Sequence, residues 1–107
     1  MLQELKEVSN VSDENGNPTG GFVKATGIEI KWQDGPLGRD GDRKEPNGAF
    51  VEGVIAAAIQ RLEFFQNSKF KCRENALAIT KLEEALLWLQ WRTINREKRS
   101  VEGTHQV

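Results

Sequence analysis

Apolar residues recur at helical spacing through much of the second half of the chain. Between 49 and 65 they fall at i, i+3, i+4, i+7, i+8 and i+11, on the stripe formed by Val51, Val54, Ile55, Ala58, Ile59 and Leu62. This pattern predicts a helix over 49–65, with Asn47 as its N-cap. Because Gly53 lowers helix propensity inside the stripe, we expect another element to pack closely there.

A second helix is predicted over 72–99. The short segment 66–68 between the two helices favours an antiparallel helical hairpin. One apolar stripe of the second helix can face the first helix, and it contains Leu82, Ala85, Leu86 and Leu89. Further apolar residues lie on other sides of the helix, namely Leu87, Trp88, Trp91 and Ile94. So small a unit cannot cover all of them, so we expect a homo-oligomer that forms through these helices.

The first third of the chain has the spacing of strands. Segment 5–10 is weakly strand-like, 13–21 is rich in turn residues, and apolar residues recur over 22–26 and, in strict alternation, over 28–32. We therefore predict a small antiparallel sheet of two or three strands. The glycine-, proline- and charge-rich stretch 33–47 is predicted to be a long loop, which is either a flexible linker or a functional segment.

These elements predict an α+β fold, with a small N-terminal antiparallel sheet and a long antiparallel two-helix hairpin. We expect a single domain, 1–107, divided into the sheet 1–32, the loop 33–47, the hairpin 48–99 and a C-terminal tail 100–107.

Composition narrows the function. The formal net charge of −1 gives the whole chain no electrostatic reason to bind DNA or RNA polymers, although a local arginine cluster can still bind a small anion. A single cysteine, Cys72, excludes an intrachain disulfide. No apolar run is long enough to span a bilayer, and the first seven residues are unlike a signal peptide. We expect a cytosolic protein with no membrane partner.

The C-terminal end of the second helix carries the candidate chemistry. Arg92, Arg96 and Arg99 are spaced i, i+4 and i+7, so they lie along one helix face and suit bidentate binding of phosphate or pyrophosphate. The alternative is that they only complement the helix macrodipole, and the residues alone favour that alternative. Thr104 and His105 can donate hydrogen bonds to a ligand if the tail folds over it; equally, the tail can be a frayed terminus.

Other candidates point to binding rather than catalysis. Phe64, Phe65 and Phe70 flank the hairpin turn and can stack on a base or simply close the core. One histidine and one distant cysteine make a poor metal site. Phosphate-binding, dinucleotide-binding and nucleophile motifs are missing from the sequence. We predict no enzyme activity, no metal and no cofactor.

Three stretches together resemble a known family. They are 30–38, 47–52 with the following 61–64, and 72–86 continued through Arg96 and Arg99 to 101–105. They are similar to the phage-encoded Thoeris anti-defence sponge proteins and, more distantly, to the helical hairpin of the anti-CBASS cyclic-nucleotide sponges. The resemblance runs from about Ile28 to the end of the chain.

The resemblance implies a non-enzymatic protein in the host cytoplasm. Such proteins bind and sequester cyclic ADP-ribose isomers made by TIR-domain immune proteins, and some hold cyclic di- or trinucleotides at separate sites. They assemble from dimers into larger rings, commonly hexamers, with the signal pocket at the dimer interface. The positions that match its ligand-binding residues are Phe65, Asn75, Arg92 and Arg96, supported by Arg99, Thr104 and His105. The alternative is an oligomeric phage interaction or assembly protein that docks a host protein.

Overall fold

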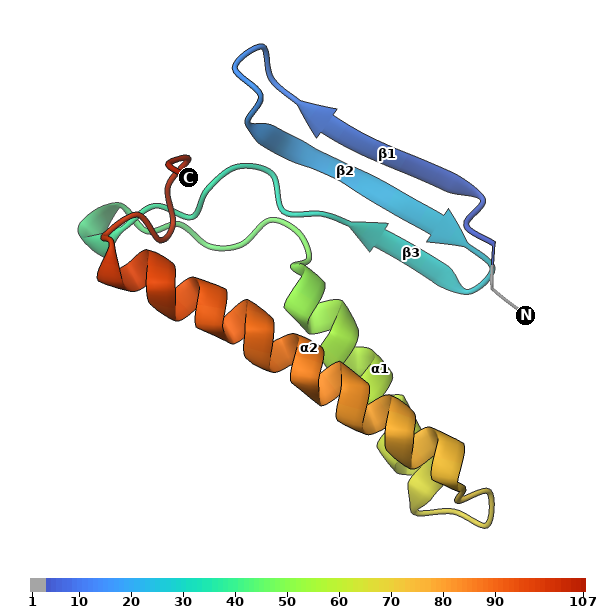
Figure 1. The fold of residues 1–107 in the computed structure, drawn as a ribbon. Helices are drawn as coiled ribbons and strands as arrows, with labels where there is room; N and C mark the ends of the chain where they lie inside the picture. The colour runs from blue at the N-terminus through green and yellow to red at the C-terminus, as the bar shows by residue number, and fades with distance from the viewer. Residues whose placement is uncertain (1–3) are drawn as a thin grey trace. The chain divides into compact units, whose positions relative to one another are not determined.

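The structure, a computed structural model, describes residues 4–107. It confirms the predicted α+β class, with a three-stranded antiparallel sheet followed by two helices (Figure 1). The chain forms two compact units: one contains the segment up to Phe50 together with Val101–Val107, and the other is Val51–Ser100. The expectation of a single domain stays a prediction. Residues 1–3 lie outside the described residues. They begin both the predicted sheet segment 1–32 and the stretch that is unlike a signal peptide.

The sheet consists of β1 (Glu7–Ser12), β2 (Pro18–Ala25) and β3 (Ile28–Lys31) in the order β1-β2-β3. Its register places Val8 opposite Val23, and Val23 opposite Ile30. The next row pairs Glu7 with Lys24 and Lys24 with Glu29. One face therefore carries an apolar row and the other a row of alternating charge, and both rows are favourable cross-strand arrangements.

The turn between β1 and β2 is shorter than the predicted 13–21, because β2 already begins at Pro18. Proline is tolerated at the first position of a strand, so the turn chemistry of the sequence overestimates the turn. Gly21 belongs to the strand, with φ of 138°, and a Cβ at this position would clash with the Ser9 carbonyl oxygen. Only glycine allows β1 and β2 to approach so closely here.

The loop 33–47 contains one turn of 3-10 helix, η1 (Asp40–Asp42), and its two ends are held together. The Asn47 backbone N–H donates to Gln33 Oε1 at 2.8 Å, and the Asp34 N–H donates to Asn47 Oδ1 at 2.8 Å. The prediction of Asn47 as a helix N-cap is therefore wrong, because its side-chain oxygen accepts from the loop. The same short polar side chain suits both roles.

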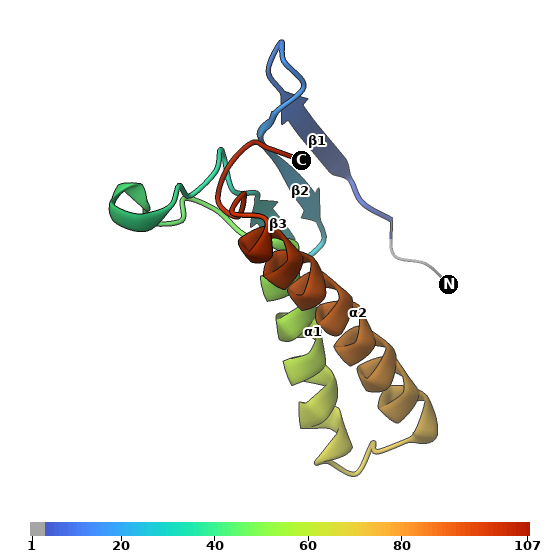
Figure 2. The same cartoon turned by 60° about the vertical axis from the view of Figure 1, so that its left-hand side comes forward.

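The hairpin consists of α1 (Val51–Gln66) and α2 (Arg73–Lys98), which lie side by side and antiparallel in Figure 2. Their bounds agree with the predicted 49–65 and 72–99 to within two residues. Ile59 is the buried residue of α1, and the half-buried positions of α2 include Ile79, Leu82, Leu86 and Leu89. The expected close packing at Gly53 is wrong, because no other element lies within 4 Å of a Cβ built there.

The helices are joined by six residues, 67–72, rather than by the three that the sequence predicts. Gln66, the last residue of α1, closes this connector. Its Nε2 donates to the Cys72 carbonyl at 3.0 Å, and its Oε1 accepts from the Cys72 N–H at 3.0 Å. The two bonds satisfy backbone groups at the point where α2 begins.

Several large apolar side chains of α2 remain exposed. They form the apolar face of α2, consisting of Leu77, Leu87, Trp88 and Trp91, whose exposed fractions are 45%, 64%, 67% and 56%. The expectation that the hairpin does not cover all of its apolar residues is confirmed for Leu87, Trp88 and Trp91, whereas Ile94 is half-buried. Within residues 4–107, none of the helices has the length and apolar character needed to cross a membrane.

Candidate ligand-binding site

The turn end of the hairpin carries two of the candidate residues. Phe65 is the penultimate residue of α1, and Asn75 is the third residue of α2. Both side chains are half-buried. The Ser68 hydroxyl donates to the Phe65 carbonyl at 2.6 Å and so fixes the chain just after this residue. A ring and an amide are thus held at the connector, where one can stack on a base and the other can exchange hydrogen bonds with it.

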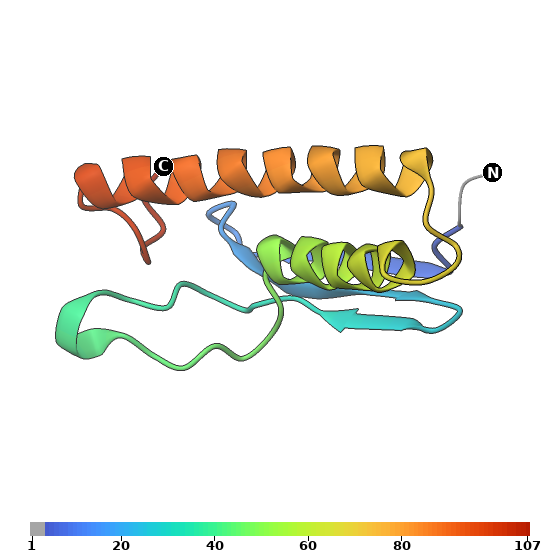
Figure 3. The ribbon, with the colours of Figure 1, turned by 90° about the horizontal axis from the view of Figure 1, so that it is seen from below.

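The arginines lie at the opposite end of α2. The helix has 26 residues against the 16 of α1, and Figure 3 shows it running beyond the first turn of α1. Arg92 and Arg96 lie on this overhang, where Arg92 is exposed and Arg96 half-buried. Arg99 caps the helix, and its backbone N–H donates to the Asn95 carbonyl at 3.1 Å.

The helix macrodipole explains the positions of only some of the basic residues at this end of α2. Its effect falls off within the last turn, which suits Arg96 and Lys98. Arg92 lies before the last turn, and it neighbours Trp88 of the apolar face at i, i+4 spacing. An exposed guanidinium beside an exposed apolar face is available to a ligand or to another chain.

One hairpin does not bring the two halves of the predicted site together. Asn75 and Arg92 are 17 residues apart on one helix, and at a rise of about 1.5 Å per residue this places them about 26 Å apart. No small ligand spans that distance between one Asn75 and the Arg92 of the same chain. Phe65 and Asn75 form one group at the turn, and Arg92 and Arg96 form another.

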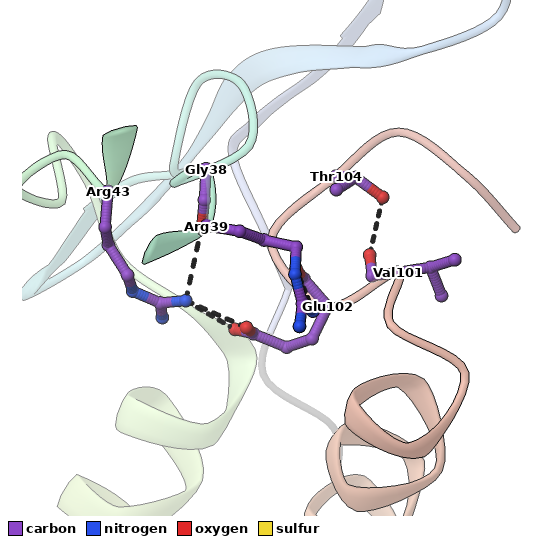
Figure 4. A network of polar contacts seen from close by, with 6 residues as sticks. All are labelled: Gly38, Arg39, Arg43, Val101, Glu102 and Thr104. Carbon is purple, nitrogen blue, oxygen red and sulfur yellow. Dashed lines mark hydrogen bonds and ion pairs between the residues drawn. The ribbon is translucent and has the colours of Figure 1, made fainter. Parts of the chain in front are cut away.

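The C-terminal tail belongs to the unit that contains the sheet and the loop, and it is folded against the loop (Figure 4). Arg43 Nη1 donates to both carboxylate oxygens of Glu102 at 2.9 Å, and Arg39 Nη1 donates to the Glu102 carbonyl at 3.0 Å. The Gly38 N–H donates to the Gly103 carbonyl at 2.8 Å. The tail is therefore not the frayed terminus that the sequence allows.

Thr104 and His105 lie in this tail. The Thr104 hydroxyl donates to the Val101 carbonyl (Figure 4) and accepts from the Gln106 N–H at 3.2 Å, so it stabilises the tail's own turn. The pKa of Asp13 is lowered mainly by the hydrogen bond that its carboxylate accepts from the Asn17 backbone N–H. His105 is exposed, and its electrostatic effect on Asp13 is a smaller contribution in the same direction. Ligand binding by Thr104 and His105 stays a prediction.

The sequence-based reasoning missed three arginines. Arg39 and Arg43 hold the tail, but no spacing in the loop links them to Glu102. Arg61 lies against the rings of Phe64 and Phe65, and its guanidinium carbon is 4.7 and 4.9 Å from the ring centroids. Its i, i+3 and i, i+4 spacing to these phenylalanines on a predicted helix was the signal that could have found it.

Metal ligation finds no support in the part of the chain that the structure describes. Among residues 4–107, no group of three or more histidine, cysteine or acidic side chains is placed to hold an ion. The expectations of no metal and no cofactor stay predictions.

A small antiparallel sheet followed by an antiparallel helical hairpin, with an aromatic turn end and a basic overhang, defines a hairpin-domain protein. Comparison with known families agrees with this class. The family model described as Acb2/Tad1, hairpin domain, matches residues 24–93, so the chain belongs to this family. The family resemblance inferred from the sequence is confirmed. The match includes Phe65, Asn75 and Arg92, whereas Arg96, Arg99 and the tail lie beyond it.

A named relative adds to this result. The protein called Thoeris anti-defense 1, from Bacillus phage SBSphiJ7, is 56% identical over 77 residues, which cover 72% of this chain and 51% of the relative. The chain therefore spans about half the length of the relative it matches.

Proposed function

We propose that this protein is a phage anti-defence protein that counters Thoeris immunity in the host cytoplasm. In this proposal it binds cyclic ADP-ribose-type signals made by TIR-domain proteins and sequesters them without degrading them. The name of the Bacillus phage relative and the hairpin-family membership support the anti-defence role. The ligand class rests on the family resemblance and on residue types that suit a base and a pyrophosphate.

The proposed binding mechanism rests on the distance between Asn75 and Arg92 along α2. Phe65 and Asn75 suit the base, and Arg92 and Arg96 suit the pyrophosphate, but in one hairpin the two groups lie about 26 Å apart. Two copies related by a two-fold axis, with their α2 helices antiparallel, would bring the turn end of one copy towards the overhang of the other. The proposed site therefore takes Phe65 and Asn75 from one copy and Arg92 and Arg96 from its partner.

The exposed apolar face of α2 supports this pairing. Its four large side chains lie on the same helix as Asn75, Arg92 and Arg96, and burial against a second copy would remove them from water. Trp88 neighbours Arg92, so burying this face would also bring the arginine to the subunit boundary. In this proposal the dimer is the unit that binds ligand. Assembly into hexamers and binding of cyclic di- or trinucleotides at separate sites stay predictions from the resemblance.

The test is retention and recovery of the signal. The purified protein is mixed with a cyclic ADP-ribose isomer, passed through a filter that retains protein, and then heated to release what it held. Intact signal after heating supports sequestration, whereas a chemically altered signal indicates an enzyme. No retention would contradict the proposal and favour the alternative of an oligomer that docks a host protein.

Single substitutions test the assigned residues. Arg92→Ala or Arg96→Ala should each remove retention, because a charge-assisted phosphate contact is lost, while the oligomer survives. Lys81→Ala is the matched control, because it removes a cation from the same helix outside both groups. Wild-type retention by both arginine variants would contradict the assignment of the site.

A further inference from the structure

Arg61 contacts two aromatic rings at the turn end of the hairpin and is not among the residues assigned to the proposed site. Its guanidinium lies over two rings, 4.7 Å from the Phe64 centroid and 4.9 Å from the Phe65 centroid. The two rings meet edge to face, with centroids 5.7 Å apart and planes at 71°. Within residues 4–107, the guanidinium contacts these two rings and forms no hydrogen bond or ion pair.

Arg61 lies over the ring of Phe65. The ring is half-buried at the end of α1, and Arg61 covers part of it from the exposed side of the helix. A guanidinium is flat, always charged and weakly hydrated, so it stacks well on a planar π-system. A nucleobase is a planar π-system of the same kind. Because the Arg61 side chain is exposed and tethered only by ring contacts, it can move outward without disturbing the core.

The surrounding charge favours an anionic planar ligand. From 61 to 73 the chain carries four cations, Arg61, Lys69, Lys71 and Arg73, and a single acidic residue, Glu63, although the whole chain has a net charge of −1. The turn end is thus locally positive and aromatic. Such a combination attracts nucleotides rather than neutral aromatic molecules.

We propose that Arg61 forms the second half of a stacking clamp, in which a nucleobase enters between its guanidinium and the ring of Phe65. This inference rests on the proposed function, because it assigns a base-recognition residue to the same site. In the free protein the guanidinium occupies the place of the base and keeps the ring oriented. When ligand binds, the guanidinium stacks on the outer face of the base.

Three variants separate this role from a structural one. Arg61→Ala removes both the plane and the charge, and Arg61→Lys keeps the charge but removes the plane. Phe64→Ala removes the second ring under the same guanidinium and leaves Phe65 in place. We expect the affinity for a cyclic ADP-ribose isomer to fall about tenfold in Arg61→Ala and nearly as far in Arg61→Lys. In Phe64→Ala it should change less than threefold. Thermal unfolding should be nearly unchanged in both Arg61 variants.

A second readout distinguishes stacking from general attraction of phosphate. In a competition experiment, AMP and ribose 5-phosphate each displace the bound cyclic ADP-ribose isomer, and their affinities are compared. The two competitors share the ribose and the phosphate, but only AMP carries a base. The wild type should prefer AMP, and this preference should shrink towards equality in Arg61→Ala. A purely structural role of Arg61 would weaken both competitors together and leave the ratio unchanged.

Each outcome decides a different point. If the wild type binds the cyclic ADP-ribose isomer but both Arg61 variants retain wild-type affinity and preference for AMP, the clamp is overturned and the proposed function stands. If Arg61→Lys matches the wild type while Arg61→Ala is weaker, charge alone acts and the clamp is again overturned. If the wild type does not bind the isomer, the proposed function fails and the clamp fails with it.

Discussion

Arg43 in the loop and Glu102 in the tail form an ion pair across 59 positions of sequence, and one guanidinium nitrogen lies 2.9 Å from both carboxylate oxygens. The side chain of Arg43 is 45% exposed and that of Glu102 is 22% exposed. The pair therefore joins two segments that the sequence places far apart, in an environment only partly shielded from water. Its contribution to global stability should be small, about 0.2–1 kcal/mol.

Glu102→Gln should loosen the tail locally without unfolding the protein. The Arg39 contact to the Glu102 backbone carbonyl survives this change, but the charge that holds Arg43 is lost. We expect faster hydrogen exchange at the Gly38 amide, which donates to Gly103, and at the Thr104 amide. High salt should have the same effect on the wild type, because it screens the pair.

The control for the tail is Lys81→Gln, which breaks the exposed pair between Lys81 and Glu84 at 3.8 Å in the hairpin. It should leave exchange at Gly38 and Thr104 unchanged. Wild-type exchange rates at both amides in Glu102→Gln would show that the ion pair does not hold the tail.

Asp13 should stabilise the β1–β2 turn in a pH-dependent way. Hydrogen bonds to its carboxylate, first from the Asn17 N–H, lower its pKa from the ordinary 3.8, so the folded state favours the ionised form. This contribution is present above pH 3.8 and is lost as the pH falls through the lowered pKa. The wild type should therefore be more stable than Asp13→Asn at neutral pH, and the difference should shrink in acid.

Denaturant unfolding of both proteins, at neutral pH and well below pH 3.8, measures this difference. Glu14→Gln removes a charge from the same turn and is the matched control. A difference between wild type and Asp13→Asn that stays constant with pH would contradict the role given to the carboxylate.

Trp88→Glu should dissociate the proposed oligomer. The Trp88 side chain is 67% exposed in the single chain, so the substitution costs little within the hairpin, but a charge buried between two copies is strongly unfavourable. Light scattering after size exclusion should show a mass well above 12.1 kDa for the wild type and close to 12.1 kDa for the variant.

Val11→Glu is the control for this experiment, because Val11 is also an exposed apolar residue, at 46%, but lies in β1, outside the hairpin. It should keep the oligomer, and both variants should keep the circular dichroism of the wild type. A wild type that already has the mass of a single chain would contradict the proposed dimer.

The sequence predicts the hairpin well because its signal is periodic. The spacing that includes Ile59 and Leu62 places α1 to within two residues, and alternation in β3 identifies the face of Ile30. The sequence predicts the wrong role for Asn47, because the same side chain can cap a helix or close a loop, and only the fold decides which backbone N–H reaches it.

Long-range polar contacts and the arrangement of the site leave no periodic pattern in the sequence, so the sequence does not predict them. Nothing in the local pattern around Arg43 specifies Glu102 as its partner, because the fold alone brings the loop and the tail together. The sequence and the resemblance nominate Phe65, Asn75, Arg92 and Arg96, and the length of α2 then separates them into two groups. Which copy supplies each group depends on assembly, which the sequence of one chain does not specify.

Mixing two inactive variants tests the shared site most directly. Phe65→Ala and Arg92→Ala should each lose ligand retention as pure oligomers, since every site then lacks one partner. If each site takes Phe65 from one copy and Arg92 from the other, a mixed dimer contains one site with both residues intact and one with neither. After subunit exchange at equal concentrations, binding should return to about one quarter of the wild-type sites. No recovery of binding in the mixture, with mixed dimers verified by mass spectrometry, would contradict a site built from two copies.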